Sequence, residues 1–134
     1  MHENVASSKK NVLRGMHFQC KYPQGKLLNL LVGKIYDVVI DLRVDSPSYG
    51  NYVGNWLEAK NYEQLYIPPG CAHGYYVVSE RALLHYKCTE YYHPEDESGV
   101  MWDDPVFNIE WPLLDLPILS KKDQAYPAVE MKVI

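Results

Sequence analysis

Short β-rich runs separated by turn residues constrain the fold of this chain more than any other feature. Pro, Gly, Asn, Asp and Ser stand between the runs, at the positions where a chain between strands must turn. No stretch before His93 shows a sustained helical period. Many short strands joined by such turns are typical of an all-β sandwich or jelly roll. The runs cover residues 12–18, 26–31, 35–43, 52–57, 64–67, 74–78 and 83–90.

The two ends of the chain differ from this pattern. Residues 1–11 are polar and predict an N-terminal arm or an edge strand. Residues 93–99 predict an acidic loop, and Ser120 is placed to cap a short helical segment near the C-terminus. With 134 residues, the chain is expected to form a single domain, 1–134, with a sandwich or jelly-roll architecture.

Charge and cysteine content exclude several function classes. The net charge of −4 argues against binding to nucleic acid or to an anionic membrane. Cys20, Cys71 and Cys88 match no zinc or CxxC spacing and are expected to be reduced. With no signal peptide and no apolar stretch long enough to cross a bilayer, we expect a cytoplasmic protein. The chain has 12 Tyr against 2 Phe, which indicates half-buried sheet surfaces and a wet, concave pocket.

Two histidines lie next to glycines, where backbone can approach a ligand closely. His17 follows Gly15, and His73 stands between Gly70 and Gly74. On a regular strand, His17 would share its face with Leu13 and Gln19, and a lone histidine there is more often a satisfied structural residue.

These histidine segments resemble the two signature stretches of cupin barrels, which raises the question of a metal. A cupin metal site needs His-x-His and a carboxylate a few residues later. Gln19 replaces the second histidine, and no Asp or Glu occurs between His17 and Lys26. We therefore predict no metal and no cofactor.

The remaining chemistry is that of acid and base. Abstracting a proton next to a carbonyl needs a base, a cation that holds the enolate oxygen, and an acid that returns the proton. His17 is a candidate base and Lys26 a candidate cation. Spacing does not select the tyrosine that would act as acid, or the aspartate that would orient the imidazole.

Ordered motifs from Lys9 to Asp123 make the chain resemble the RmlC-type dTDP-4-dehydrorhamnose 3,5-epimerases. The motifs run in order over most of the chain, so chance similarity is a poor explanation. They lie at residues 9–19, 23–27, 37–43, 46–50, 67–74, 86–87, 91–92, 111–112 and 119–123.

The resemblance implies a metal-free jelly-roll homodimer that epimerises a nucleotide-linked 4-keto-6-deoxyhexose on the path to dTDP-L-rhamnose. By this resemblance, His17 is the catalytic base and Asp123 its partner. Lys26 then stabilises the enolate, and Tyr86 is the acid on the opposite face of the sugar.

The substrate-binding residues are assigned in the same way. Arg14 and His73 correspond to positions that line the sugar-diphosphate site, and Tyr92 to an aromatic near the nucleobase. Asn4 is the residue retained from a family Gln-Asp-Asn-His run near the substrate. We also assign Gln19 and Lys122 to this set.

The chain departs from the family pattern at its N-terminus. Family members usually carry a longer N-terminal segment, with a strand exchanged between subunits and residues that reach the partner's nucleotide. The resemblance therefore implies an intact acid–base centre and a reduced hold on the nucleotide.

Each assignment has a structural alternative. Lys26 could be a solvated strand end, Tyr86 a cross-strand packing residue, and Asp123 part of a surface charge cluster. Arg14 could simply pair with an acidic neighbour. At the level of function, the alternatives are a non-catalytic nucleotide-sugar binding protein, an epimerase acting at C3 or C5 only, and a related ketoisomerase.

Overall fold

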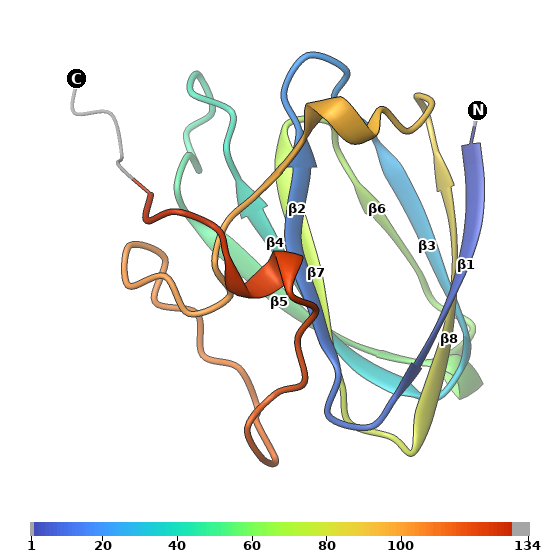
Figure 1. Cartoon of the computed structure of the whole chain (residues 1–134). Coiled ribbons are helices and arrows are strands. Elements are labelled where there is room, and N and C mark those ends of the chain that lie inside the picture. Colours follow the sequence, from blue (N-terminus) through green and yellow to red (C-terminus); the bar gives the residue numbers. More distant parts are fainter. Residues whose placement is uncertain (1, 130–134) are drawn as a thin grey trace.

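The computed structural model describes residues 2–129, which form two antiparallel β-sheets that face each other (Figure 1). The first sheet has the order β1-β8-β3-β6, with β1 at His2–Lys9, β8 at Arg81–Cys88, β3 at Lys26–Val32 and β6 at Gln64–Ile67. The second has the order β5-β4-β7-β2-β9, with β5 at Tyr52–Glu58, β4 at Lys34–Asp41, β7 at Cys71–Val77, β2 at Leu13–Gln19 and β9 at Glu97–Gly99. Three single 3-10 turns complete the fold: η1 (Ala59–Asn61), η2 (Pro94–Asp96) and η3 (Lys122–Gln124).

An inner core fills the space between the sheets. Alternation along each strand directs every second side chain inward, so apolar residues of both sheets meet there. Leu28 and Leu84 come from the first sheet, and Ile35, Tyr75 and Val77 from the second.

A second core lies on the outer face of the five-stranded sheet. The C-terminal part of the chain passes over this face (Figure 1), and Val100 and Phe107 pack against Met16, Val38 and Ile40. Because β7 is covered on both faces, all its residues are buried. Buried polar groups on β7 must therefore find partners inside the protein.

The all-β jelly roll predicted from the strand pattern is confirmed, and the strands differ from the predicted runs by a few residues at their ends. Residues 2–9 form the edge strand β1, paired with β8. The prediction of a loop over residues 93–99 was wrong in part, because Glu97–Gly99 pairs with β2 as β9. The predicted C-terminal helical segment is the single turn η3, and the residue at its N-cap is Lys121, not Ser120. The Ser120 hydroxyl lies just before the turn and accepts a hydrogen bond from the Asp123 amide.

A bulge in β2 changes the faces predicted for its side chains. Arg14 pairs with Tyr75 and His17 with His73, so three steps along β2 correspond to two steps along β7. The extra residue turns both Arg14 and His17 toward the interior, whereas Leu13 lies opposite the outward-facing Tyr76. Because the strand is not regular, His17 does not share its face with Leu13, but it lines the same cavity as Gln19.

No helix in the described residues is long and apolar enough to span a membrane. Cys20 is exposed, Cys71 and Cys88 are buried, and none of the three is in a disulfide within the described residues.

Candidate active site

A cavity of about 280 Å³ opens between the two sheets, at the end where β2, β3 and β8 meet the loops. A smaller cavity of about 120 Å³ shares three of its lining residues, His17, Lys26 and Tyr86. These three side chains therefore stand where the two spaces meet. The larger cavity is also lined by Asn4, Gln19, Tyr92, Glu97 and Lys122, and the smaller one by Arg14, His73 and Tyr75.

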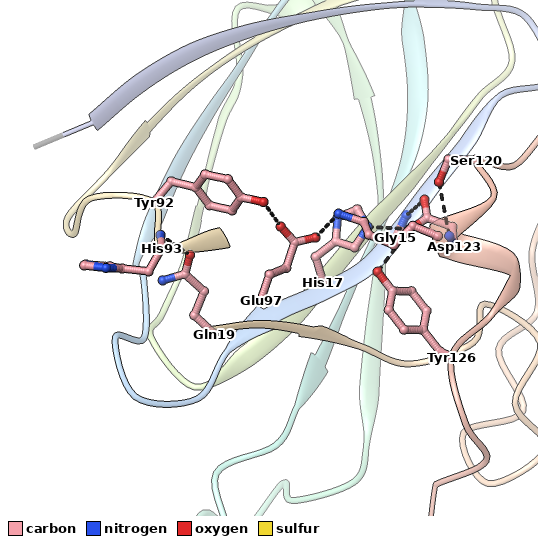
Figure 2. A network of polar contacts seen from close by, with 10 residues as sticks. Gly15, His17, Gln19, Tyr92, His93, Glu97, Ser120, Asp123 and Tyr126 are labelled. Carbon is pink, nitrogen blue, oxygen red and sulfur yellow. Dashed lines mark hydrogen bonds and ion pairs between the residues drawn. The ribbon is translucent and has the colours of Figure 1, made fainter. Parts of the chain in front are cut away.

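His17 and Asp123 form a hydrogen-bonded pair beside this cavity (Figure 2). His17 Nε2 lies 2.6 Å from Asp123 Oδ1, and the Asp123 side chain is almost fully buried behind the imidazole. Because Nε2 is engaged by the carboxylate, Nδ1 is the ring nitrogen left to exchange a proton with a ligand. The pair has the geometry of a general base with its orienting carboxylate.

Several donors hold the Asp123 carboxylate. Burial acts to raise its pKa, but the hydrogen bond and charge of His17, the Gly15 amide and the Tyr126 hydroxyl outweigh burial, so the pKa lies below its ordinary value. Gly15 N donates to Oδ2 at 3.1 Å. Gly15 has a φ of +128°, and a Cβ there would lie 2.6 Å from Gly74 Cα, so only glycine brings this amide to the carboxylate.

A second buried histidine–aspartate pair lies inside the barrel. His73 Nε2 on β7 is 2.6 Å from Asp37 Oδ2 on the neighbouring strand β4. Burial raises the pKa of Asp37, although His73 and Lys26 act to lower it. Within residues 2–129, Asp37 Oδ1 has no hydrogen-bond partner. The sequence offered a signal for this pair, because Asp37 is a carboxylate within an apolar strand.

Lys26 extends from β3 into both cavities. Burial lowers the pKa of its ammonium group, and charge interactions with Cys88, Glu97 and Asp37 act in the opposite direction. A partly desolvated cation in this position can stabilise negative charge that develops on a bound oxygen. Lys26 is therefore not a solvated strand end.

Tyr86 faces the interior from β8, opposite Asn4 of β1 and Leu28 of β3. Asn4 Nδ2 donates to Tyr86 Oη at 3.0 Å, so the phenolic proton is free to point elsewhere. Burial raises the pKa of Tyr86, which keeps the hydroxyl protonated and able to donate.

Glu97 organises the outer part of the cavity. Its carboxylate accepts a hydrogen bond from the Tyr92 hydroxyl (Figure 2). It also pairs with the Lys122 ammonium group. The hydrogen bond with Glu97 is the main reason why the pKa of Tyr92 is raised to about 12. Sequence reasoning missed Glu97, because it lies in the segment predicted as a loop.

Gln19 links the two loops that border the cavity. Its side-chain Nε2 donates to the Tyr22 carbonyl at 2.7 Å, and its Oε1 accepts from the His93 amide at 3.1 Å. The rings of Tyr22 and His93 also stack, with their centroids 3.8 Å apart. Gln19 therefore lines the cavity while its amide is occupied by the protein.

The structure brings the residues predicted from sequence together around one site. Asn4, His17, Gln19, Lys26, Tyr86, Tyr92 and Lys122 line the larger cavity, and Arg14 and His73 line the smaller one. Asp123 supports His17 from behind. Sequence reasoning missed Asp37, Glu97 and Tyr126, whose contacts depend on packing between distant segments. Within residues 2–129, no group of three or more His, Cys, Asp or Glu side chains is arranged to hold a metal ion.

Comparison with known proteins gives a consistent result. The family model described as dTDP-4-dehydrorhamnose 3,5-epimerase matches residues 1–131. A dTDP-4-dehydrorhamnose 3,5-epimerase of Salmonella typhimurium is 47% identical over 133 residues, which are 98% of this chain and 73% of that protein. One from Neisseria gonorrhoeae is 48% identical over 123 residues, but this chain spans only 38% of its length.

Solved structures agree with the sequence comparisons. The structure of dTDP-6-deoxy-D-glucose-3,5-epimerase RmlC from Legionella pneumophila in complex with dTDP-4-keto-L-rhamnose matches with a TM-score of 0.92 and 45% identity. The match covers 96% of this chain and 68% of that one. The dTDP-4-dehydrorhamnose 3,5-epimerase of Elizabethkingia anophelis matches with the same TM-score, 0.92, and 42% identity.

Proposed function

Because the chain belongs to the dTDP-4-dehydrorhamnose 3,5-epimerase family, we propose that it is an isomerase that inverts C3, C5 or both in a dTDP-4-keto-6-deoxyhexose. The observation that carries this proposal is the meeting of His17, Lys26 and Tyr86 at one cavity, with Asp123 behind His17. A site that only binds a sugar has no need of this acid–base set.

The C4 ketone of such a sugar acidifies the protons on C3 and C5. In the proposed reaction, His17 Nδ1 removes one of these protons, and the Asp123 carboxylate stabilises the imidazolium that forms. Lys26 holds the enolate oxygen while the negative charge is on it. Tyr86 then delivers a proton to the same carbon from the opposite face, which inverts the centre.

Binding of the nucleotide sugar is assigned to the polar and charged side chains around the cavities. Arg14 and His73 would face the sugar and diphosphate from the smaller cavity, and Lys122 the diphosphate from the larger one. Tyr92 would lie beside the nucleobase. Asn4 and Gln19 would act through their hydrogen bonds to Tyr86 and to the two bordering loops.

We further propose that the protein is a homodimer in the cytoplasm. The outer face of the four-stranded sheet exposes Val5, Leu31 and Tyr66, whose relative accessibilities lie between 48% and 55%. An apolar face of this kind is suited to a protein partner. Size-exclusion chromatography with light scattering would give the oligomeric state, and a monomer at micromolar concentration would contradict the dimer.

Incubation with dTDP-4-keto-6-deoxyglucose in deuterated water tests the reaction. Deuterium should enter C3, C5 or both, as seen by mass spectrometry and NMR, and inverted product should form. The His17→Ala variant should lose both deuterium incorporation and product formation. His85→Ala, which alters a histidine outside the cavities, should retain both activities.

The outcome separates the alternatives. Binding of the nucleotide sugar without deuterium incorporation would contradict catalysis and favour a binding protein. Incorporation at one carbon alone would define a monoepimerase, and a product with its carbonyl moved would define a ketoisomerase.

A further inference from the structure

Tyr126 contacts the His17–Asp123 pair from the C-terminal segment, and the acid–base steps above leave it without a role (Figure 2). Its hydroxyl donates to Asp123 Oδ1 at 3.2 Å. Its ring meets the His17 imidazole edge to face, with centroids 6.3 Å apart and an interplanar angle of 71°. Tyr126 is partly buried, whereas Ala125, Pro127 and Ala128 beside it are exposed.

The Tyr126 ring packs against Gly99, where there is no side chain. A Cβ at Gly99 of β9 would lie 2.2 Å from the Tyr126 ring, so the ring occupies the place of a side chain there. Beyond Tyr126, the Val129 amide donates to Asp104 Oδ2 at 3.0 Å, which anchors the segment that contains Tyr126. Two independent features therefore hold the phenol against Asp123.

The hydroxyl shares its acceptor with the imidazole. His17 Nε2 and Tyr126 Oη both approach Asp123 Oδ1, while the Gly15 amide binds Oδ2. A donor on Oδ1 withdraws negative charge from the oxygen that faces the imidazole, and an imidazolium is stabilised by that charge. Tyr126 should therefore restrain the basicity of His17 and, through edge-to-face contact, its orientation.

We propose that Tyr126 is a positioning residue for the catalytic base, holding Asp123 Oδ1 and thereby setting the orientation and proton affinity of His17. The inference rests on the proposed role of His17 in the reaction. It adds a third member to the histidine–aspartate pair and assigns that role to the segment that follows η3.

Other titratable groups also face His17. Glu97 comes from β9, Lys26 from β3, Tyr86 from β8, and Lys122 precedes Asp123 in η3. His73, paired with Asp37, lies opposite His17 on β7. Removing the Tyr126 hydroxyl leaves all of these in place, so a change in His17 titration in Tyr126→Phe is due to the lost hydrogen bond.

The test is an NMR titration of the His17 imidazole in the free protein, which needs no substrate. In Tyr126→Phe, the midpoint should rise by about half a pH unit relative to wild type, because one hydrogen bond to the carboxylate partner of the imidazole is lost. The acidic limb of the pH profile of deuterium exchange should move to higher pH by the same amount. Tyr62→Phe, which removes a hydroxyl from a tyrosine that is 89% exposed, should change neither.

Two further variants complete the test. Asp123→Asn should lower the midpoint, because it removes the negative charge. Gly99→Ala should displace the ring and raise the midpoint as Tyr126→Phe does. An unchanged midpoint in Tyr126→Phe, with the expected decrease in Asp123→Asn, would overturn the inference. A raised midpoint in a protein without exchange activity would uphold the contact and contradict only the proposed function.

Discussion

His17 Nε2 lies 2.6 Å from Asp123 Oδ1, although 106 positions separate the two residues in the chain. One comes from a bulged strand and the other from a single 3-10 turn that packs beside it. The pair forms only when the C-terminal segment has crossed the outer face of the sheet.

The carboxylate of this pair should be required for proton abstraction. Asp123→Asn keeps the shape of the side chain but removes the charge that stabilises the imidazolium, and the amide can favour the wrong imidazole tautomer. We expect kcat for deuterium exchange to fall by about a hundred- to ten-thousandfold. Asp103→Asn, at an exposed aspartate, serves as the control and should retain wild-type kcat. Equal rates in Asp123→Asn and wild type would remove Asp123 from the mechanism.

Loss of the Tyr86 hydroxyl should separate exchange from inversion. In Tyr86→Phe, His17 can still remove and return a proton on its own face, but the acid on the other face is missing. Formation of inverted product should fall by about a hundredfold or more, while exchange at the carbon falls less. Rates of product formation and of deuterium exchange, measured by NMR on the same sample, provide the comparison. A parallel fall in both would contradict the assignment of Tyr86 as the acid.

The charge on Lys26 should limit activity at high pH. Burial lowers the pKa of Lys26, so the ammonium group loses its proton at a lower pH than an ordinary lysine does. Burial raises the pKa of Tyr86, which therefore stays protonated over the same range. Lys26→Met should reduce kcat by about a hundred- to a thousandfold. In Lys26→Arg, the activity that remains should persist to higher pH than in wild type, and a basic limb at the same pH in both would exclude Lys26 as its cause.

Asp41 should stabilise the turn after β4. Its carboxylate accepts hydrogen bonds from the Arg43 side chain and from the hydroxyls of Ser46 and Ser48. The hydrogen bond from Arg43 is the main cause that holds the pKa of Asp41 well below its ordinary value. Asp41→Asn should therefore lower the melting temperature by several degrees at neutral pH.

The pH dependence of this effect follows from the direction of the shift. A carboxyl whose pKa is depressed in the folded state contributes its full stabilisation above its unfolded pKa of about 3.9. The contribution is lost as the pH falls through the lower, folded value. The difference in melting temperature between wild type and Asp41→Asn should thus shrink below about pH 4. Asp45→Asn, at an exposed aspartate in the same turn, is the control, and a difference that grows on acidification would contradict the argument.

Local patterns in the sequence determined the fold class and most of the strands. Alternating apolar residues and turn residues act over a few positions, so they can be identified without knowledge of tertiary contacts. By resemblance, the ordered motifs also assign His17, Lys26, Tyr86 and Asp123 to an acid–base site.

Tertiary structure alone decided which groups meet. The bulge that turns Arg14 and His17 to the same interior face depends on pairing between β2 and β7. The pairing of Asp37 with His73, and the contact of the Tyr126 ring with His17, join segments whose approach is set by how the sheets and the C-terminal segment pack. A hydrogen bond depends on distances of a few tenths of an ångström, and only the folded backbone sets these.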